Sequence, residues 1–377
     1  MATTAPETIV NLDVYRVAIP LAEPYHLSKV YGTRTHADAV IVRMTTAGGA
    51  QGWGEGDPGG FDFTGDTGEM IMASINTDLL AEIIGTRVDD WVESGQGLQR
   101  SGSWGAALDI AAYDALGKLH RQPVWALLGE KRRDEVDSLW PTSSGTADAD
   151  LQVIQAKLAE GFRTFMLKMG SRSIDEDVER LSKVAAVLSP EVGLMVDANQ
   201  GWQLDEALEF ADRTRDVPLV LIEQPLAAAD HSGLATLHEA CQLPLSVDEG
   251  LQSLDDASTI ATKGIADIFS IKVSKNGGLR AGLEIAKTAK THGISILMNS
   301  MLELGITQSA SLHLGCVLDS LVDCGHAYMS TLRMSDDISN FSDFVSRGTA
   351  HLPSGPGLGI QVSENKIRAY LKDECHA

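Results

Sequence analysis

The stretch "LVLIEQPL" at residues 219–226 joins an apolar run to a carboxylate. The apolar residues suit a strand that is covered on both faces, yet the run ends at Glu223, and a glutamate is almost never fully buried without a partner. The runs "MVDAN" and "SVDEG" reach Asp197 and Asp248 in the same way. One such carboxylate would suit a lysine pair or a helix cap, but three on successive strands predict a common site.

Short apolar runs recur at nearly regular intervals along most of the chain. Their polar last residues Lys168, Asp197, Glu223, Asp248 and Lys272 are 29, 26, 25 and 24 residues apart, which is about the length of one strand-and-helix unit. The eight runs are "VDSLW", "TFMLKM", "GLMVDA", "LVLIE", "PLSVDE", "IFSIKV", "SILMNS" and "LVDCG". We therefore expect an α/β fold in which eight units close into a (β/α)₈ barrel, with its chemistry at the carboxyl ends of the strands.

The first third of the chain has a different pattern. "TIVNLDVYRVAI" and "ADAVIVRMTT" alternate apolar and polar residues, which predicts a small antiparallel sheet, whereas "GEMIMASINTDLLAEIIG" and "WGAALDIAAYDALGKLHRQPVWALLG" have helical periodicity. The predicted domains are an α+β domain over 1–130, the barrel over 131–345, and a C-terminal segment over 346–377 that packs back on the first domain.

Composition and charge narrow the functional classes. A formal net charge of −22 repels nucleic acid and anionic membranes, and the four cysteines lack zinc-like spacing, which favours reduced thiols in a cytoplasmic enzyme. The N-terminal stretch lacks the basic flank and apolar core of a signal peptide, and no run of about 18 apolar residues occurs. We expect no export, no membrane span and no nucleic-acid partner.

Three carboxylates on adjacent strand ends would repel one another strongly unless a cation held them. An all-oxygen set with room for a substrate oxygen suits magnesium better than zinc. Lys168 and Lys272 flank the three carboxylates and would face each other across the barrel mouth. A lysine near a divalent cation has a depressed pKa and can act as a general base, although either lysine could instead only neutralise carboxylates. Lys275, three residues further on, is expected to be structural or to cap a helix.

This arrangement fits proton abstraction from the carbon next to a substrate carboxylate. One lysine removes the proton, the cation charge favours the enediolate, and the second lysine returns a proton from the opposite face or assists a leaving group. A Schiff-base aldolase is disfavoured because the clustered carboxylates would keep either lysine protonated. A non-catalytic binding protein is weaker still, because the whole set of metal ligands and lysines is present.

The motifs resemble the enolase superfamily, and within it the muconate-lactonizing-enzyme-like subgroup, over essentially the whole chain. They are "GWGEG", "AALDIAAYDALGK", "PVWALLGE", "LKMG", "VDANQGW", "IEQPL", "DEG", "IKVSKNGG" and "MLELGI". The resemblance implies a capping domain on a modified TIM barrel, Mg²⁺ or Mn²⁺ on Asp197, Glu223 and Asp248, and acid/base lysines at Lys168 and Lys272. Asp248 is preferred over Glu249 because the subgroup uses an aspartate as the third ligand. The resemblance further implies a homo-oligomer and a small-molecule carboxylate as substrate.

Several further residues follow from the resemblance. Asn199 and Glu249 correspond to partners of the metal ligands, and Asn299 and Glu303 near the seventh strand are expected to contact substrate. The capping segments 22–36 and 57–68 are expected to select the substrate. The first segment offers Tyr25, His26 and Tyr31. His326 and Tyr328 stand just past the eighth run, where packing in the core is the commoner fate for a histidine.

One position departs from the subgroup. Lysine-x-lysine is usual at the end of the second strand, but this chain has Met166, Leu167 and Lys168. The missing first lysine leaves the substrate unassigned. A racemase or epimerase of a carboxylic acid, such as an amino-acid derivative, is favoured because two opposed lysines support removal and return of a proton. A cycloisomerase or a dehydratase or other lyase is the alternative, since one lysine would suffice there.

Overall fold

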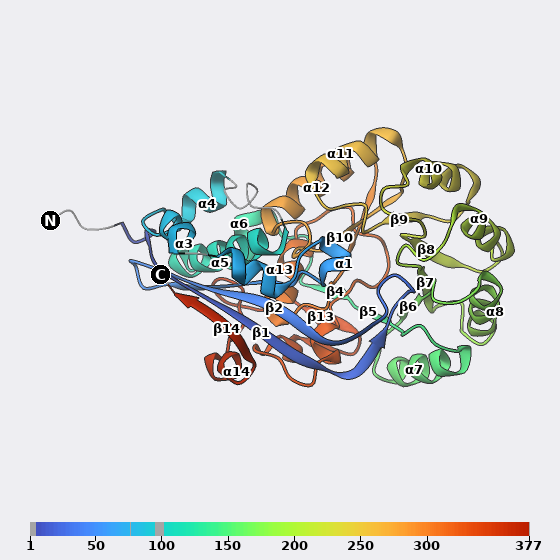
Figure 1. Ribbon diagram of the computed structural model, residues 1–377, viewed down its shortest axis with the longest axis horizontal. Helices are drawn as coiled ribbons and strands as arrows, with labels where there is room; N and C mark the ends of the chain where they lie inside the picture. The colour runs from blue at the N-terminus through green and yellow to red at the C-terminus, as the bar shows by residue number, and fades with distance from the viewer. Residues whose placement is uncertain (1–4, 76, 95–101, 377) are drawn as a thin grey trace.

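The computed structural model describes residues 5–75, 77–94 and 102–376 and has a mixed α/β architecture (Figure 1). Its described strands form a four-stranded sheet near the N-terminus, a curled seven-stranded parallel sheet and a small three-stranded sheet. Of the helix predicted over 68–85, one helix ends at Ser74 and a second begins at Thr77, and Asn76 lies outside the described residues. The fold class predicted from the sequence is confirmed.

The N-terminal sheet has the order β14-β1-β2-β3 and is antiparallel. Its strands are β1 (Ile9–His26), β2 (Thr33–Thr46), β3 (Gln51–Gly56) and β14 (Leu371–His376). Because β14 pairs with β1, the C-terminal tail returns to the first sheet (Figure 1). The segment 22–36 was expected to be a loop, but most of it belongs to β1 and β2.

Helix α5 (Gly102–His120) packs directly on β3. Gly52, Gly54 and Gly56 alternate along the strand, so they share one face. A Cβ atom on Gly54 would lie 1.8 Å from the carbonyl oxygen of Ala107, and the other two glycines face α5 in the same way. Only glycine allows this approach, so the motif "GWGEG" fixes the helix against the sheet. The other helices of this part are α1 (Phe61–Thr64), α2 (Gly68–Ser74), α3 (Thr77–Ile83), α4 (Val88–Ser94) and α6 (Val124–Leu128).

The parallel sheet has the order β11-β10-β9-β8-β7-β6-β5, so consecutive strands are neighbours. The strands are β5 (Leu139–Pro141), β6 (Thr164–Lys168), β7 (Gly193–Asp197), β8 (Leu219–Glu223), β9 (Leu245–Val247), β10 (Ile268–Ile271) and β11 (Ser295–Met298). The helices between and after them are α7 (Ala147–Ala159), α8 (Ile174–Ala185), α9 (Leu204–Arg213), α10 (His231–Ala240), α11 (Leu254–Lys263), α12 (Leu279–Thr291) and α13 (Gly305–Gly315).

The first and the eighth predicted strands differ from expectation. The run "VDSLW" is split into β4 (Glu135–Asp137), which pairs with the tail strand β13 (Thr349–His351), and β5 in the barrel. The eighth run forms only isolated parallel bridges, from Leu321 to Ile296 and from His326 to Ser138. These bridges connect the two edges of the sheet and close the barrel. The remaining elements are η2 (Ser330–Arg333), η3 (Phe341–Phe344), β12 (Val345–Ser346) and α14 (Glu364–Ala369).

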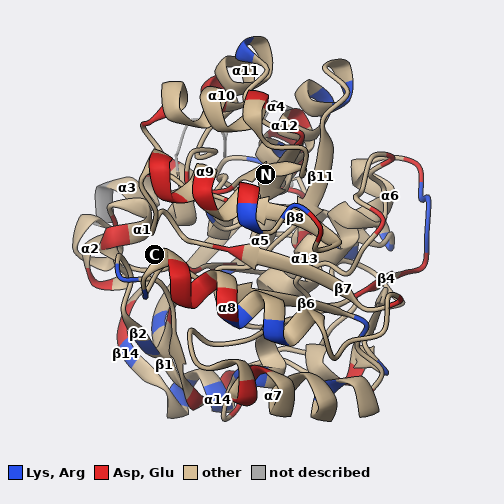
Figure 2. Ribbon diagram, turned by 90° about the vertical axis from the view of Figure 1, so that its right-hand side faces the viewer, with Lys and Arg blue, Asp and Glu red and all other residues tan. Residues whose placement is uncertain are grey.

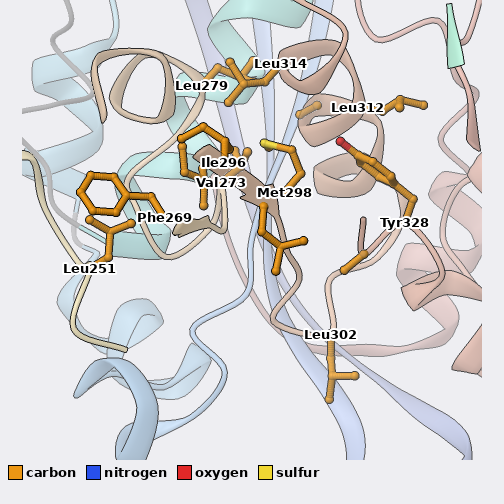
Figure 3. Close-up of a cluster of buried hydrophobic side chains, with 14 of the residues drawn as sticks. Leu251, Phe269, Val273, Leu279, Ile296, Met298, Leu302, Leu312, Leu314 and Tyr328 are labelled. Atoms are coloured by element: carbon orange, nitrogen blue, oxygen red, sulfur yellow. The ribbon is translucent and has the colours of Figure 1, made fainter. Parts of the chain in front are cut away.

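Alternate residues of β10 and β11 anchor the barrel to its helices. Phe269, Ile296 and Met298 lie in the buried apolar cluster together with Leu279 of α12 and Leu314 of α13 (Figure 3). Since successive side chains of a strand point to opposite faces, the residues between them face the barrel interior. The strand ends next to the site are therefore held by packing on their outer face.

Acidic residues gather in the first turns of several barrel helices, including α8, α9 and α11, and Figure 2 shows them interspersed with lysines and arginines. Carboxylates at these positions interact favourably with the helix dipole, which accounts for part of the negative net charge. Among the described helices, none is both long and apolar enough to cross a membrane.

Candidate active site

Strand register brings the predicted polar residues side by side. Lys168 is opposite Asp197 in the β6–β7 pair, and Asp197 is opposite Glu223 in the β7–β8 pair. Asp248 and Lys272 directly follow β9 and β10. All five side chains are buried or nearly so. Because the carboxyl ends of parallel strands share one edge of the sheet, these residues gather at one end of the barrel.

Lysines neutralise two of the three carboxylates. Lys168 forms an ion pair with Asp197. Lys272 lies 2.6 Å from one oxygen of Asp248, and Lys275 lies 2.7 Å from the other. The expectation for Lys275 was structural, and its fully buried ammonium group indeed contacts the side chain of Asp248 and its backbone carbonyl. Its role thus lies within the site and not at a helix end.

Amide side chains hold the carboxylates in place. Asn199 donates from its backbone N–H to Asp197 (2.8 Å), and its side-chain amide donates to Asp197 (2.9 Å) and Glu249 (3.2 Å). Asn299 donates to Glu223 (2.8 Å) and to the Ser270 hydroxyl (2.9 Å). Asn299 was expected to contact substrate, and it lines the cavity, but the structure adds this orienting contact with Glu223.

Backbone strain accompanies these contacts. Asn199 and Gln200 have φ values of 43° and 62°, and Gln224 has 32°. Such left-handed conformations are uncommon outside glycine and tend to gather at functional sites. The Gln224 side chain accepts the Asp248 backbone N–H at 2.9 Å, which ties the ends of β8 and β9 together.

Burial and charge set the pKa values of the site. Burial raises the pKa of Glu223 to about 8, and repulsion from Asp197 and Asp248 adds to the shift. Burial by itself disfavours the charged form of Lys168, but interactions with Asp197, Tyr25 and Glu223 together outweigh it and raise the pKa of Lys168 above its usual value. Lys272 behaves alike beside Asp248. Both lysines thus favour their charged form while they contact the carboxylates, and the depressed pKa expected beside a divalent cation stays a prediction.

The donor set fits a hard divalent cation. One oxygen of Glu223, one of Glu249 and the Asn199 amide oxygen are buried without a hydrogen-bond partner, and carboxylate and amide oxygens are what magnesium prefers. Among the described residues, no three acidic, histidine or cysteine side chains stand close enough to hold an ion as they are. In this structure Lys168, Lys272 and Lys275 contact oxygens of Asp197 and Asp248, and these contacts would have to loosen for an ion to use the same oxygens.

A cavity of about 220 Å³ lies between the barrel mouth and the first domain. Lys168, Lys272 and Asn199 line it from the barrel. Its apolar lining on the barrel side consists of Leu139, Pro141, Met166, Met301, Leu302, Ala327 and Met329. From the N-terminal part it is lined by Tyr25, Leu27, Tyr31, Thr33, Arg34, Thr35, His36, Ala37, Asp38, Asp57, Gly59, Gly60, Phe63 and Thr67. A small molecule that reaches the lysines is therefore enclosed by both parts of the chain.

Only some of the residues that were predicted to contact substrate line the cavity. Tyr25 and Tyr31 line the cavity, whereas His26 is exposed and its ring contacts Thr33 at 2.8 Å. Glu303 is buried outside the lining and pairs with the Ser300 hydroxyl.

His326 and Tyr328 are also core residues. The ring nitrogens of His326 contact the Met298 N–H (3.0 Å) and the Val322 carbonyl (3.2 Å), and Tyr328 donates to the Ser311 carbonyl (3.2 Å). Their neighbours Ala327 and Met329 face the cavity instead.

Two further residues of the cavity were not singled out in the sequence. Arg34 lines it from the start of β2, and Phe63 lies over the Lys272 ammonium group at 4.5 Å from its ring centroid. Phe63 also packs on Tyr31, with ring centroids 5.3 Å apart. Both lie in the capping segments that were expected to select substrate. The one sequence signal that could have indicated Arg34 is the alternation along β2, but this part of β2 had been interpreted as a loop.

Two family models together match most of the chain. Residues 9–129 match the mandelate racemase / muconate lactonizing enzyme N-terminal domain, and residues 150–366 match the enolase C-terminal domain-like family.

Curated relatives include isomerases of different substrates. Muconate cycloisomerase 1-2 of Acinetobacter lwoffii is 30% identical over 374 residues, covering 98% of this chain and 96% of the relative. N-succinyl-L-Arg/Lys racemase of Bacillus cereus is 28% identical, covering 96% of this chain and 97% of the relative.

Solved structures agree over nearly the full length. The crystal structure of N-succinyl Arg/Lys racemase from Bacillus cereus has a TM-score of 0.91 at 26% identity and covers 98% of this chain and 100% of that chain. Dipeptide epimerase from Enterococcus faecalis, complexed with Mg and the dipeptide L-Leu-L-Tyr, has a TM-score of 0.86 at 27% identity and covers 94% of this chain and 99% of that chain. The chain therefore belongs to the mandelate racemase / muconate lactonizing enzyme family of the enolase superfamily, in its muconate-lactonizing-enzyme-like subgroup.

Proposed function

We propose that this protein is a magnesium-dependent isomerase that removes the proton on the carbon next to a substrate carboxylate and returns it on the opposite face. The observation that supports the proposal is the placement of Lys168 at the end of β6 and of Lys272 directly after β10, since these strands are four positions apart in the sheet order. Four positions correspond to opposite sides of an eight-unit barrel. Both lysines line the same cavity.

In this proposal the two lysines carry out the two proton transfers. A neutral lysine Nζ takes the proton as the C–H bond breaks, and the electron pair passes into the carboxylate to give an enediolate. The opposite lysine, as an ammonium group, donates a proton to the other face. Abstraction requires a neutral amine, so the basic lysine must first leave its partner, Asp197 for Lys168 or Asp248 for Lys272.

Magnesium would be held by Asp197, Glu223 and Asp248, with Asn199 and Glu249 supporting them. When bound, it supplies positive charge that favours the enediolate. The buried oxygen of Glu223 that lacks a partner, and the raised pKa of this carboxyl, support its place in the set.

The alternative is a cycloisomerase or a dehydratase, in which only one lysine transfers a proton. The muconate cycloisomerases among the relatives support this alternative as strongly as the N-succinyl-L-Arg/Lys racemase supports the two-lysine reaction. The apolar Met166 in the cavity, where the subgroup usually has a lysine, removes positive charge near the substrate and supports a different substrate from those of standard members. We further propose a homo-oligomeric enzyme in the cytoplasm, which the relatives do not contradict.

Solvent exchange tests the proposal directly. The protein with Mg²⁺ is incubated in deuterated water with a panel of chiral N-acylated amino acids and other small carboxylic acids, and the adjacent carbon is followed by NMR. We expect deuterium at that carbon together with inversion of its configuration, and loss of both on chelation. Exchange with ring closure or loss of water would favour the alternative, and no exchange across the panel would contradict the proposal.

A further inference from the structure

Arg180 is a charged residue on the buried face of α8, outside the cavity lining. Its side chain is 4% exposed, and its guanidinium group donates two hydrogen bonds to Asp150 of α7, at 2.6 and 2.9 Å. The two helices pack on each other (Figure 1). A buried ion pair gains little net stability, because the loss of hydration offsets the attraction. The pair alone therefore does not account for an arginine at this position.

The guanidinium group also binds the backbone at the end of β6. Its Nη1 donates to the carbonyl oxygen of Lys168 at 2.6 Å, and its Nη2 donates to the carbonyl oxygen of Ser143 at 2.9 Å. One side chain thus joins the last residue of β6 to the segment that follows β5. Arginine suits this role because its rigid fork presents several N–H donors in fixed directions.

The sheet itself leaves the carbonyl of Lys168 without a backbone donor. The neighbouring strand β5 ends at Pro141, and in a parallel pair the N–H of Ser144 would be the next donor. That N–H donates instead to the carbonyl of His26 at 2.8 Å. Two side chains take its place, and the hydrogen bond from Arg180 (2.6 Å) is shorter than the one from the Ser144 hydroxyl (3.2 Å).

A second residue of α8 fixes the chain directly after Lys168. Asp177 accepts the Gly170 N–H at 3.0 Å and the indole N–H of Trp202 at 3.1 Å. Residues three apart on a helix share a face, so Asp177 and Arg180 act from the same side of α8. The strand end that carries the lysine is therefore anchored by this one helix.

Lys272, the lysine across the barrel, is supported differently. The side-chain oxygen of Asn276 accepts its N–H at 2.9 Å, and the side-chain amide of Asn276 donates to the Leu251 carbonyl at 2.8 Å. Both partners are neutral, and neither lies on α7 or α8. Loss of Arg180 should therefore disturb one lysine and not the other.

We propose that Arg180 is a positioning residue for proton transfer by Lys168. It does not line the cavity, but it holds the backbone from which the Lys168 side chain extends. This inference rests on the proposed function, in which Lys168 serves one face of the substrate. A small displacement of a reacting group lowers the rate steeply, so a looser strand end should slow the Lys168 half of the reaction alone.

Two variants loosen the contact without leaving an unpaired buried charge. Arg180→Lys keeps a cation beside Asp150 but loses the fork, and Arg180→Met combined with Asp150→Asn removes both charges. Arg133→Met is the matched control. It removes another arginine that donates to two backbone carbonyls, those of Gly315 (2.6 Å) and Leu318 (2.7 Å), at and after the end of α13.

Chemical labelling tests the inference without turnover. The full chain is acetylated briefly with sulfosuccinimidyl acetate in the presence of EDTA, and the modified fractions of Lys168 and Lys272 are measured by peptide mass spectrometry. We expect Lys168 to react at least about threefold faster in both Arg180 variants, because a looser strand end frees its amine from Asp197. Lys272 should stay within about twofold of its wild-type rate, as should both lysines in Arg133→Met. An unchanged rate at Lys168, or an equal rise at both lysines, would overturn the inference.

Solvent exchange gives the second readout. The test compound is the first of the panel that exchanges with deuterated water in the wild type, and the stereoisomer served by Lys168 is the one whose exchange Lys168→Met abolishes. For this stereoisomer we expect kcat to fall about tenfold or more in both Arg180 variants, with KM within about twofold. Exchange of the other stereoisomer should stay within about twofold of the wild-type rate.

The two proposals fail in different ways. Equal losses for both stereoisomers in the Arg180 variants would overturn the positioning role and leave the reaction standing. No exchange of any panel compound by the wild type, or loss of exchange of both stereoisomers in Lys168→Met, would refute the two-base reaction. The labelling result alone would then decide whether Arg180 positions Lys168.

Discussion

The two walls of the cavity differ in how their side chains are held. On the barrel wall, Lys168, Lys272 and Asn299 stand at strand ends, and each is fixed by an ion pair or hydrogen bond to a carboxylate. On the capping wall, no described side chain forms an ion pair or a hydrogen bond with Arg34, and the Phe63 ring packs on Tyr31 and over the Lys272 ammonium group. We therefore expect the barrel wall to determine the reaction and the capping wall to determine which substrate is accepted.

The largest effect is expected on the barrel wall. Asp197→Asn, Glu223→Gln and Asp248→Asn each remove a charge from the proposed metal site and should lower turnover by roughly a thousandfold or more. Magnesium affinity, measured by calorimetry, should fall while the circular dichroism spectrum stays unchanged.

Asp255→Asn is the matched control, because it removes an exposed carboxylate in the first turn of α11. It should behave as the wild type. If Glu223→Gln kept full activity and magnesium affinity, Glu223 would leave the ligand set.

We expect the capping wall to be less firmly held at its cavity face than at the contact between α5 and β3, which should be rigid. Gly54→Ala would place a Cβ 1.8 Å from the Ala107 carbonyl oxygen, so α5 and β3 must separate. We expect the free energy of unfolding in urea to fall by about 3 kcal/mol.

Gly145→Ala provides the comparison, because the nearest atom to its new Cβ would be 3.8 Å away. Its free energy of unfolding should stay within about 1 kcal/mol of the wild-type value. Equal stability of the two variants would show that the close contact between α5 and β3 does not hold the capping part.

Smaller effects are expected from single residues on the capping wall, and neighbours in the sequence should differ. Tyr25 lines the cavity and its ring lies 4.0 Å from the guanidinium carbon of Arg333, so Tyr25→Ala should raise KM roughly tenfold. His26→Ala should change kcat and KM less than about twofold, because His26 is exposed outside the cavity. A larger effect of His26→Ala than of Tyr25→Ala would reverse the assignment of the two faces.

The contrast between Tyr25 and His26 also explains what the sequence could predict. The barrel residues were predictable because a strand end recurs once per unit, so Lys168, Asp197 and Glu223 fall in register without knowledge of their surroundings. The segment 22–36 looked like a loop because its glycine, proline and polar residues mask a strand pair. Alternation along β1 then decides that Tyr25 faces inward and His26 outward.

Long-range packing determines the features of the structure that the sequence did not predict. The eighth run and the residue after it pair with neighbouring strands only through isolated bridges, at Leu321 and His326. The apolar pattern of the run does not distinguish such bridges from a full strand. Likewise, nothing near Lys275 in the sequence indicates that its ammonium group would be buried against Asp248 on the neighbouring strand end. Both features depend on residues about 25 or more positions away.

The most direct test of the two-base reaction separates the lysines by stereochemistry. In Lys168→Met and Lys272→Met, which keep bulk at a crowded barrel mouth, racemisation of a substrate found in the exchange panel should be lost in both directions. Exchange with deuterated water should survive for one stereoisomer in each variant, and for opposite stereoisomers in the two, while magnesium still binds. Ordinary racemisation by Lys272→Met, or loss of all exchange of both isomers in both variants, would contradict the account.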